Sequence, residues 1–446
     1  MEESSKRSFK IILGMLIGSL IYCYFFYYTK PVHRTETYVE NNEIVIVLDG
    51  EGHCYLGDDP DKGKWADTDD SYACRLPFVS GPVDLYLSNR YNYRAPKEEG
   101  LIFSYIESVK ILGGDVYLAV DDEEKITYET KYKGEIDEKI ILTSADPKIA
   151  EISEDGVIHS VAPGKTTVTA TFGDMKDTIN VTVTDLIVKM PPEFDTSKPF
   201  LSAELYSEED NDLMDAILES RVEKAGYLTR AGAVAAARFL GLEFPYRINY
   251  FTENGRINSY RNVEADGEGR YYHKGLYLHP SRYVNIDPTR IVSGPKPWGY
   301  PMAELSYNRV AANGLDCSGS ITWILVQAGF DPGDIGAGIM AGVKDMTDLG
   351  EMYWLADAID NKTIKVGDLL SGGDGGAAGG GHIALLAAID PDGYFYVAEE
   401  LGYRTHWGFW LRKYDRNELL RYFYWQVDMD DFYGHKDGNL TDYWME

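Results

Sequence analysis

The first feature in the hydrophobic pattern of the chain is an apolar run near the N-terminus. Residues Ile11 to Tyr28 carry no charged side chain, and Lys6, Arg7 and Lys10 precede them. About 20 apolar residues cross a bilayer as a helix, and several tyrosines crowd the outer end of this run, as interfacial aromatics do. Because no small-residue cleavage site follows, the pattern predicts an uncleaved signal anchor in residues 1–35 and an extracellular remainder, with a cleaved signal peptide as the alternative.

Short β-type runs separated by turn residues fill the stretch from residue 105 to 187. Asp155-Gly156 and Pro163-Gly164 are typical turn dipeptides. Alternating or β-branched residues predict five strands here: Val116–Val120, Lys139–Thr143, Ile149–Ile152, Thr166–Phe172 and Thr178–Val183. The preceding residues 36–104 hold one strand-like run, Glu43–Leu48, and are predicted to be a membrane-proximal region.

The pattern turns helical after a linker that contains Pro191 and Pro192. Apolar residues recur at helical spacing from Glu208 onward, and Thr229 is a suitable N-cap for the alanine-rich stretch that runs to Leu242. Residues 188–294 are therefore predicted to be a linker with a helical and irregular region that packs on the domain after it.

Composition and charge narrow the range of partners. The 446 residues predict two to four domains, and the formal net charge is −29. A nucleic-acid partner is excluded because phosphate binding needs clustered Lys and Arg. The charge also gives no attraction toward anionic membranes or wall polymers.

The four cysteines fall in different settings. Cys23 lies in the predicted anchor, and Cys54 and Cys74 share one Gly- and Asp-rich stretch. An exported chain meets an oxidising exterior, so a disulfide between Cys54 and Cys74 is one of two open possibilities. Cys317 stands alone downstream and needs a different explanation.

Cys317 is predicted to lie at the start of a helix. It follows Asp316 in a Gly-Leu-Asp-Cys-Ser-Gly run and precedes the apolar helix pattern Ile321–Gly329. Backbone N–H groups and the helix dipole favour an anion at a helix N-terminus, and so favour a reactive thiolate. This is the chemistry that a cysteine nucleophile needs.

His382 begins a predicted buried strand and is the candidate base. If the following turn pairs Ile389 with Tyr394, then Glu399 shares the face of His382 and can fix its tautomer. Glu400 is the rival for this third position. No His or Cys cluster has zinc spacing, so no metal is predicted.

Two segments resemble known families. The residues "TSADPKIAEISEDGVIHSVAPGKTTVTATFGD", Thr143 to Asp174, resemble the group 2 bacterial Ig-like domain, which implies a β-sandwich that serves as a spacer or an adhesive module. The motifs "PWG", "GLDCSGSITW", "KVGDLL" and "GHIALLAAI" resemble the NlpC/P60 papain-like endopeptidases of bacterial cell walls. This second likeness covers roughly residues 295 to 425.

The NlpC/P60 resemblance implies roles for individual residues. Cys317 would be the nucleophile, His382 the base and Glu399 the third residue, in a site that cleaves amide bonds of peptidoglycan stem peptides without a cofactor. Trp298, Asp316 and Ser318 are the candidate substrate-binding residues, the last two through helix capping and the shape of the oxyanion site. The third residue of the family is usually His, Asn or Gln. A glutamate leaves open whether the enzyme is an endopeptidase or a CHAP-type amidase.

Together these patterns predict a multidomain fold: a transmembrane helix, an all-β Ig-like sandwich and an α+β papain-like domain at residues 295–446. The predicted function is a membrane-anchored, single-pass extracellular peptidoglycan hydrolase of a Gram-positive bacterium. One alternative is a non-enzymatic surface protein that serves adhesion or scaffolding and binds surface or envelope proteins. Another is a cysteine protease or transferase that acts on other substrates.

Overall fold

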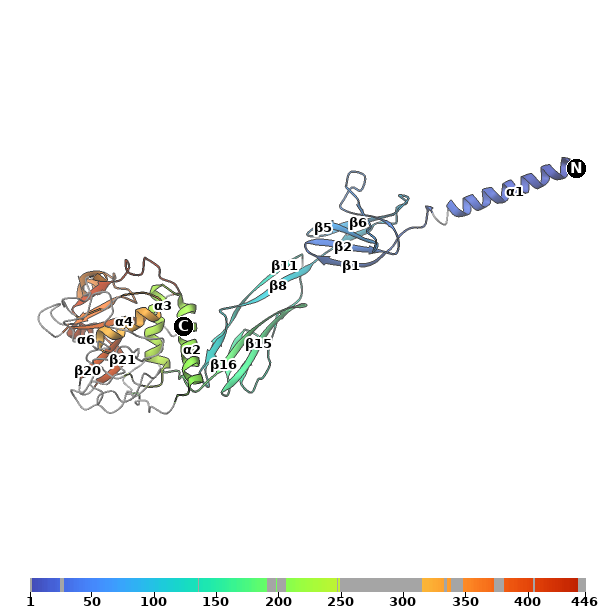
Figure 1. Cartoon of the computed structure of the whole chain (residues 1–446). Helices are drawn as coiled ribbons and strands as arrows, with labels where there is room; N and C mark the ends of the chain where they lie inside the picture. Colours follow the sequence, from blue (N-terminus) through green and yellow to red (C-terminus); the bar gives the residue numbers. More distant parts are fainter. Residues whose placement is uncertain are drawn as a thin grey trace.

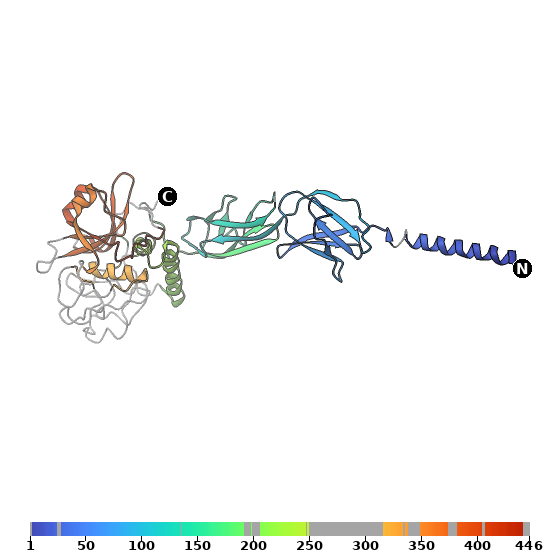
Figure 2. The ribbon, with the colours of Figure 1, turned by 90° about the horizontal axis from the view of Figure 1, so that it is seen from above.

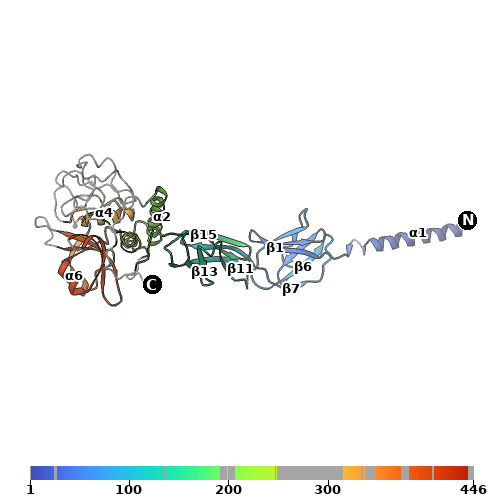
Figure 3. The same cartoon turned by 90° about the horizontal axis from the view of Figure 1, so that it is seen from below.

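Four parts of the chain follow one another along a line. The computed structural model describes residues 2–24, 28–134, 136–190, 198, 206–246, 248, 315–332, 335–337, 348–372, 381–403 and 406–439. An N-terminal helix is followed by two β units and then by a C-terminal unit of helices and strands (Figure 1). Views from above and below show the same order (Figures 2 and 3).

The N-terminal helix covers most of the predicted membrane span. Helix α1 runs from Glu2 to Cys23, and within it only Ile11–Cys23 is free of charged residues. No helix in the described part of the chain is both long and apolar enough to cross a membrane, so the prediction of a transmembrane helix is not confirmed.

The first β unit, residues 34–101, is more regular than predicted. Its seven strands are β1 Arg34–Glu40, β2 Glu43–Leu48, β3 Gly52–Leu56, β4 Ala66–Asp67, β5 Ala73–Pro77, β6 Val83–Asn89 and β7 Glu98–Leu101. They form sheets of order β1-β2-β5 and β4-β3-β6-β7. Only β2 had been expected, because the other strands are short and rich in polar residues.

Two cysteines meet in the core of the first β unit. Cys54 of β3 and Cys74 of β5 are fully buried, and both are free thiols. A hydrogen bond between the two thiols and their burial raise the pKa of Cys54. The structure thus shows a reduced pair in contact and no disulfide.

The second β unit, residues 105–183, contains the strands predicted for it. Its nine strands are β8 Tyr105–Leu112, β9 Val116–Leu118, β10 Glu123–Lys125, β11 Thr127–Lys133, β12 Ile141–Ser144, β13 Ala150–Ile152, β14 Val157–Ser160, β15 Gly164–Phe172 and β16 Met175–Val183. The sheets have the orders β12-β15-β16-β9, β10-β14-β13 and β11-β8. Alternate residues of β15, such as Val168 and Ala170, fill the core, as a period of two requires.

The C-terminal unit combines helices with one antiparallel sheet. Its helices are α2 Glu208–Ala225, α3 Arg230–Arg238, the short π-helix η2 Phe239–Glu243, α4 Cys317–Gln327, α5 Leu355–Asp360 and α6 Arg416–Tyr422. Its strands are β17 Glu351–Trp354, β18 Leu369–Gly372, β19 His382–Ile389, β20 Phe395–Tyr403, β21 His406–Tyr414 and β22 Trp425–Asp428. The sheet order is β17-β22-β18-β19-β20-β21. Thr229 caps α3 as predicted, because its side chain accepts a hydrogen bond from the Gly232 N–H.

Helix α4 is buried on nearly all sides. It contacts α3 and strands β19 and β20, and Ile321, Trp323 and Ile324 are completely inaccessible to solvent. A helix that is apolar all round belongs in a protein interior. This position fixes the first turn of α4, and with it Cys317, next to the sheet.

Polar contacts join the second β unit to the C-terminal unit. Arg221 of α2 donates to the Tyr117 carbonyl oxygen at 2.7 Å and to the Glu243 carboxylate at 2.9 Å. Lys224 of the same helix binds Glu124 of β10 at 2.7 Å. The side chain of Arg221 is only 17% exposed, so its ion pair is held in a largely dry contact.

Candidate active site

Cys317 is the first residue of α4, and Asp316 caps the helix. The Asp316 Oδ1 atom accepts hydrogen bonds from the Gly319 N–H at 2.8 Å and from the Ser318 hydroxyl at 3.1 Å. Cys317 is 7% exposed. The thiol therefore lies at the positive end of a buried helix dipole. Asp316 and Ser318 both act in this cap, and their roles toward a substrate stay a prediction.

His382 lies between Cys317 and Glu399. A side-chain hydrogen bond joins the imidazole to Cys317, and the imidazole Nε2 lies 2.8 Å from the Glu399 Oε2. The contact with Glu399 uses Nε2. Phe423 packs beside the ring, with 5.6 Å between the ring centroids.

The pKa of His382 is shifted strongly toward the charged form. Burial alone lowers this pKa, but the hydrogen bonds and charges of Cys317 and Glu399 outweigh burial and raise it to about 10. The protonated ring can donate to a thiolate on one side and to a carboxylate on the other. The raised pKa thus favours the protonated imidazolium at neutral pH.

Glu399 is held by two residues that the sequence analysis did not identify. Its side chain is 2% exposed, and its Oε1 accepts a hydrogen bond from the Tyr414 hydroxyl at 2.5 Å. Arg412 Nη1 lies 3.5 Å from the same oxygen. Burial and the charge of Glu399 raise the pKa of Tyr414, which keeps this hydroxyl protonated as a donor. Arg412 and Tyr414 lie two residues apart on β21, and that spacing was the signal that could have marked them as a pair.

The register between β19 and β20 differs from the predicted one at the turn and agrees with it at the site. Ile389 pairs with Phe395 instead of Tyr394. A shift in register between Leu386 and Ala388 then restores the predicted alignment, so that Leu385 pairs with Ala398. Glu399, and not Glu400, contacts His382. Glu400 is fully buried as well, but it belongs to the opposite face of β20.

One predicted site residue cannot be placed. Trp298 lies outside the described residues. Within the part of the chain that the structure describes, no three His, Cys, Asp or Glu residues are grouped closely enough to hold a metal ion.

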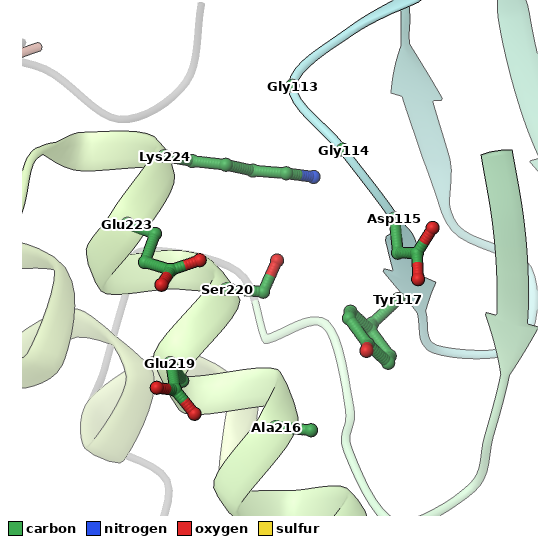
Figure 4. Close-up of a pocket in the computed structure, with 9 residues that line it drawn as sticks. All are labelled: Gly113, Gly114, Asp115, Tyr117, Ala216, Glu219, Ser220, Glu223 and Lys224. Atoms are coloured by element: carbon green, nitrogen blue, oxygen red, sulfur yellow. The ribbon is translucent and has the colours of Figure 1, made fainter.

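An open cavity lies away from these residues. It has a volume of about 660 Å³ and lies between β9 and α2. Its lining carries the carboxylates of Asp115, Glu219 and Glu223 and the ammonium of Lys224 (Figure 4). Cys317, His382 and Glu399 are not part of this lining, so the cavity is separate from the candidate active site.

Several solved structures show a weak likeness to the chain. Domains 5–6 of the S-layer protein SbsC align at 18% identity and a TM-score of 0.18, over 21% of this chain and 55% of that one. A 282-residue fragment of intimin, in complex with the intimin-binding domain of its receptor Tir, aligns at 14% identity and a TM-score of 0.23, over 38% of this chain and 68% of that one. Fibronectin(III)-like modules of Clostridium thermocellum CbhA align at 12% identity and a TM-score of 0.19, over 34% of this chain and 93% of that one.

Likeness this weak does not indicate a shared function. The chain spans about half of the SbsC fragment that it matches. No curated protein matches it significantly, and no comparison supplies evidence for an NlpC/P60 peptidase domain. One family model does match: the bacterial Ig-like domain (group 2), over residues 106–183. The second β unit is therefore a bacterial Ig-like domain of group 2, as the resemblance carried by Thr143–Asp174 implied.

Proposed function

We propose that the chain is a cysteine hydrolase that cleaves amide bonds, with Cys317 as nucleophile, His382 as general acid and base, and Glu399 as the residue that orients His382. The observation that carries this proposal is the hydrogen-bonded series of thiol, imidazole and carboxylate at a helix N-terminus. A structural cysteine needs no such series. A nucleophile needs both the lowered cost of the thiolate and an oriented proton carrier.

The reaction follows from the protonation states. The Cys317 thiolate attacks the amide carbonyl carbon, and the electron pair of the carbonyl moves to its oxygen. When the C–N bond breaks, the His382 imidazolium gives its proton to the leaving amine, and a thioester remains on Cys317. His382, now neutral, takes a proton from water, and the resulting hydroxide attacks the thioester. The acid leaves and Cys317 returns to the thiolate.

The motifs around the site support a peptidoglycan substrate. The resemblance to NlpC/P60 peptidases points to the amide bonds of stem peptides, cut by an endopeptidase or by an amidase. Bacterial Ig-like domains of the matched group would suit a spacer that holds such a domain at a cell surface. The exposed apolar side chains of α1, among them Ile12, Met15 and Leu16, support attachment of the N-terminus to an apolar partner or layer.

Digestion of purified peptidoglycan tests the proposal. The chain is incubated with walls of several stem-peptide chemistries, and the released fragments are identified by mass spectrometry. We expect fragments that are absent with Cys317→Ala and present with Cys54→Ala, a matched control that removes a thiol from the first β unit. The mass of the new termini identifies the bond. If no wall yields fragments and Cys317 does not react with iodoacetamide, the hydrolase proposal is wrong.

A second function is favoured by the family match. The Ig-like domain and the adjoining β unit make up an extended all-β segment, and such modules serve adhesion or scaffolding in the non-enzymatic alternative. In that case the Cys317→Ala chain would bind isolated cell surfaces as well as the unchanged chain does, and residues 31–187 would carry the binding. Thiol reactivity distinguishes the two functions, because a binding module needs no reactive cysteine.

A further inference from the structure

The strand that carries His382 contains a β-bulge. Between the turn and the bulge, Ile389 pairs with Phe395 and Ala388 with Tyr396. Beyond it, Leu386 pairs with Val397 and Leu385 with Ala398. Ala387 is therefore an extra residue on β19 with no partner in the ladder. Ala387 and Ala388 are both buried in the same core cluster, although neighbours on a regular strand point to opposite faces.

This extra residue decides which glutamate reaches His382. If the pairing of Ile389 with Phe395 continued without a bulge, His382 would lie opposite Gly402, and even-numbered residues of β20 would share its face. Glu400 would then be its neighbour. With the bulge, the register set by Leu385 and Ala398, continued to His382, places this residue opposite Leu401, so that odd-numbered residues of β20 share its face. A slip of one residue moves a whole set of side chains to the other face, and here it determines that Glu399 is the partner.

Arg238 holds the bulge in place. It is the last residue of α3, which packs against β19. Its Nε and Nη2 atoms donate to the Ala387 carbonyl oxygen at 3.0 Å and 2.7 Å. A bulged residue is removed from the ladder, so its buried carbonyl needs another donor. One guanidinium supplies two, and an arginine is always charged.

We propose that Arg238 is a positioning residue of the active site, which fixes the bulge at Ala387 and thereby selects Glu399 over Glu400 as the partner of His382. The consequence of this selection for catalysis rests on the proposed hydrolase. Which carboxylate contacts the imidazole does not depend on that proposal. Arg238 acts through the strand, because its two described hydrogen bonds go to the Ala387 carbonyl oxygen.

The titration of His382, followed by NMR in the full chain, tests this role. Arg238→Met keeps an apolar stem but no donor. We expect the pKa of His382 to fall by about one pH unit or more, because without the bulge the imidazole loses Glu399, the carboxylate that Tyr414 and Arg412 hold beside it. Arg238→Lys retains one charged donor and should restore part of the shift. The matched control is Arg221→Met, which removes an arginine of similar bonding from α2, and we expect it to lower stability and leave the His382 pKa unchanged.

A second variant keeps the test informative if Arg238→Met unfolds the chain. Deletion of Ala387 removes the extra residue and leaves a continuous ladder in the Glu399 register. In that background the Arg238→Lys exchange should no longer change the pKa of His382, because there is no bulge left to hold. A shift of equal size with and without Ala387 would overturn the proposal. So would an unchanged His382 pKa in a folded Arg238→Met chain.

The outcome is separable from that of the hydrolase proposal. If the Arg238 variants shift the pKa of His382 while the unchanged chain cleaves no wall, the positioning role stands and the hydrolase does not. If the chain cleaves walls and Arg238→Met leaves both the pKa and the pH dependence of cleavage unchanged, the positioning role fails alone.

Discussion

Exchange of Glu399 by glutamine is the most direct probe of the charged pair at the site. Glutamine has nearly the same size and keeps an oxygen that accepts from Tyr414, but it removes the negative charge 2.8 Å from the imidazole Nε2. An opposite charge at such a distance raises a pKa by about 1 to 3 pH units. The pKa of His382 should therefore fall from about 10 to between about 7 and 9.

The same pKa shift gives the free energy by which Glu399 stabilises the imidazolium, and the direction in which stability changes with pH. One pH unit corresponds to about 1.4 kcal/mol, so the carboxylate stabilises the imidazolium by about 1.4 to 4 kcal/mol. Because the folded pKa of His382 lies above its ordinary value of 6.5, this contribution to stability is complete below pH 6.5 and is lost as the pH rises through about 10. In Glu399→Gln the contribution should be smaller, and its loss should be complete at a lower pH.

Two assays measure the shift. NMR of histidine-labelled chain follows the imidazole directly, with the His382 resonance assigned by its absence from His382→Gln. The second assay measures the rate of Cys317 carboxamidomethylation as a function of pH. At the alkaline end of this curve, the rate changes as His382 loses its proton and its ion pair. Glu400→Gln is the control and should change neither curve. If the curves of Glu399→Gln match those of the unchanged chain, or if Glu400→Gln moves them as far, the reasoning from the contact is refuted.

Three further predictions concern stability and redox chemistry. Tyr414→Phe removes the hydrogen bond to the buried carboxylate of the site, and we expect denaturant unfolding to show a loss of about 1 to 3 kcal/mol; an unchanged midpoint would contradict the contact. Arg230→Met removes the guanidinium that lies 2.8 Å from Asp368 and leaves this buried carboxylate without its ion-pair partner. The free energy of unfolding should fall by about 3 to 5 kcal/mol, whereas a fall below about 1 kcal/mol would mean that the pair is not desolvated. Refolding with oxidised glutathione should join Cys54 to Cys74 by thiol–disulfide exchange and stabilise the chain by about 3 kcal/mol, which peptide mapping without reductant checks; persistence of two alkylatable thiols would count against their contact.

The sequence was sufficient where the pattern is local. The alternation of Thr166–Phe172 marks β15, the Asp316 cap marks the start of α4, and the turn dipeptides separate the strands of the Ig-like domain. Each of these depends on residues a few positions apart. Most strands of the first β unit were not predicted, because they are short, carry many polar residues and pair with strands that are distant in the sequence.

The candidate site was predictable as a set of residues but not as a register. A thiol, an imidazole and a glutamate in the right order identify Cys317, His382 and Glu399. The bulge at Ala387 has no local signature, since Ala-Ala fits a regular strand equally well. It depends on Arg238, nearly 150 positions earlier, and on a turn one residue longer than assumed. The predicted and observed registers agree at His382 only because these two differences cancel.

The contacts of Arg221 have a consequence for how the chain would explore its surroundings. An arginine that bonds both the Tyr117 carbonyl and Glu243 clamps the Ig-like domain to the unit that carries Cys317. The linker after β16 is bonded to the same region, because the N–H groups of Val188 and Met190 donate to the carbonyl oxygens of Glu243 and Leu242. With a rigid joint at this position, the Ig-like domain and the C-terminal unit move as one body. The distance that Cys317 can reach is then set by the combined length of the two units. Loss of the Arg221 contacts would make this joint flexible. Cys317 would then sample the whole volume within that distance.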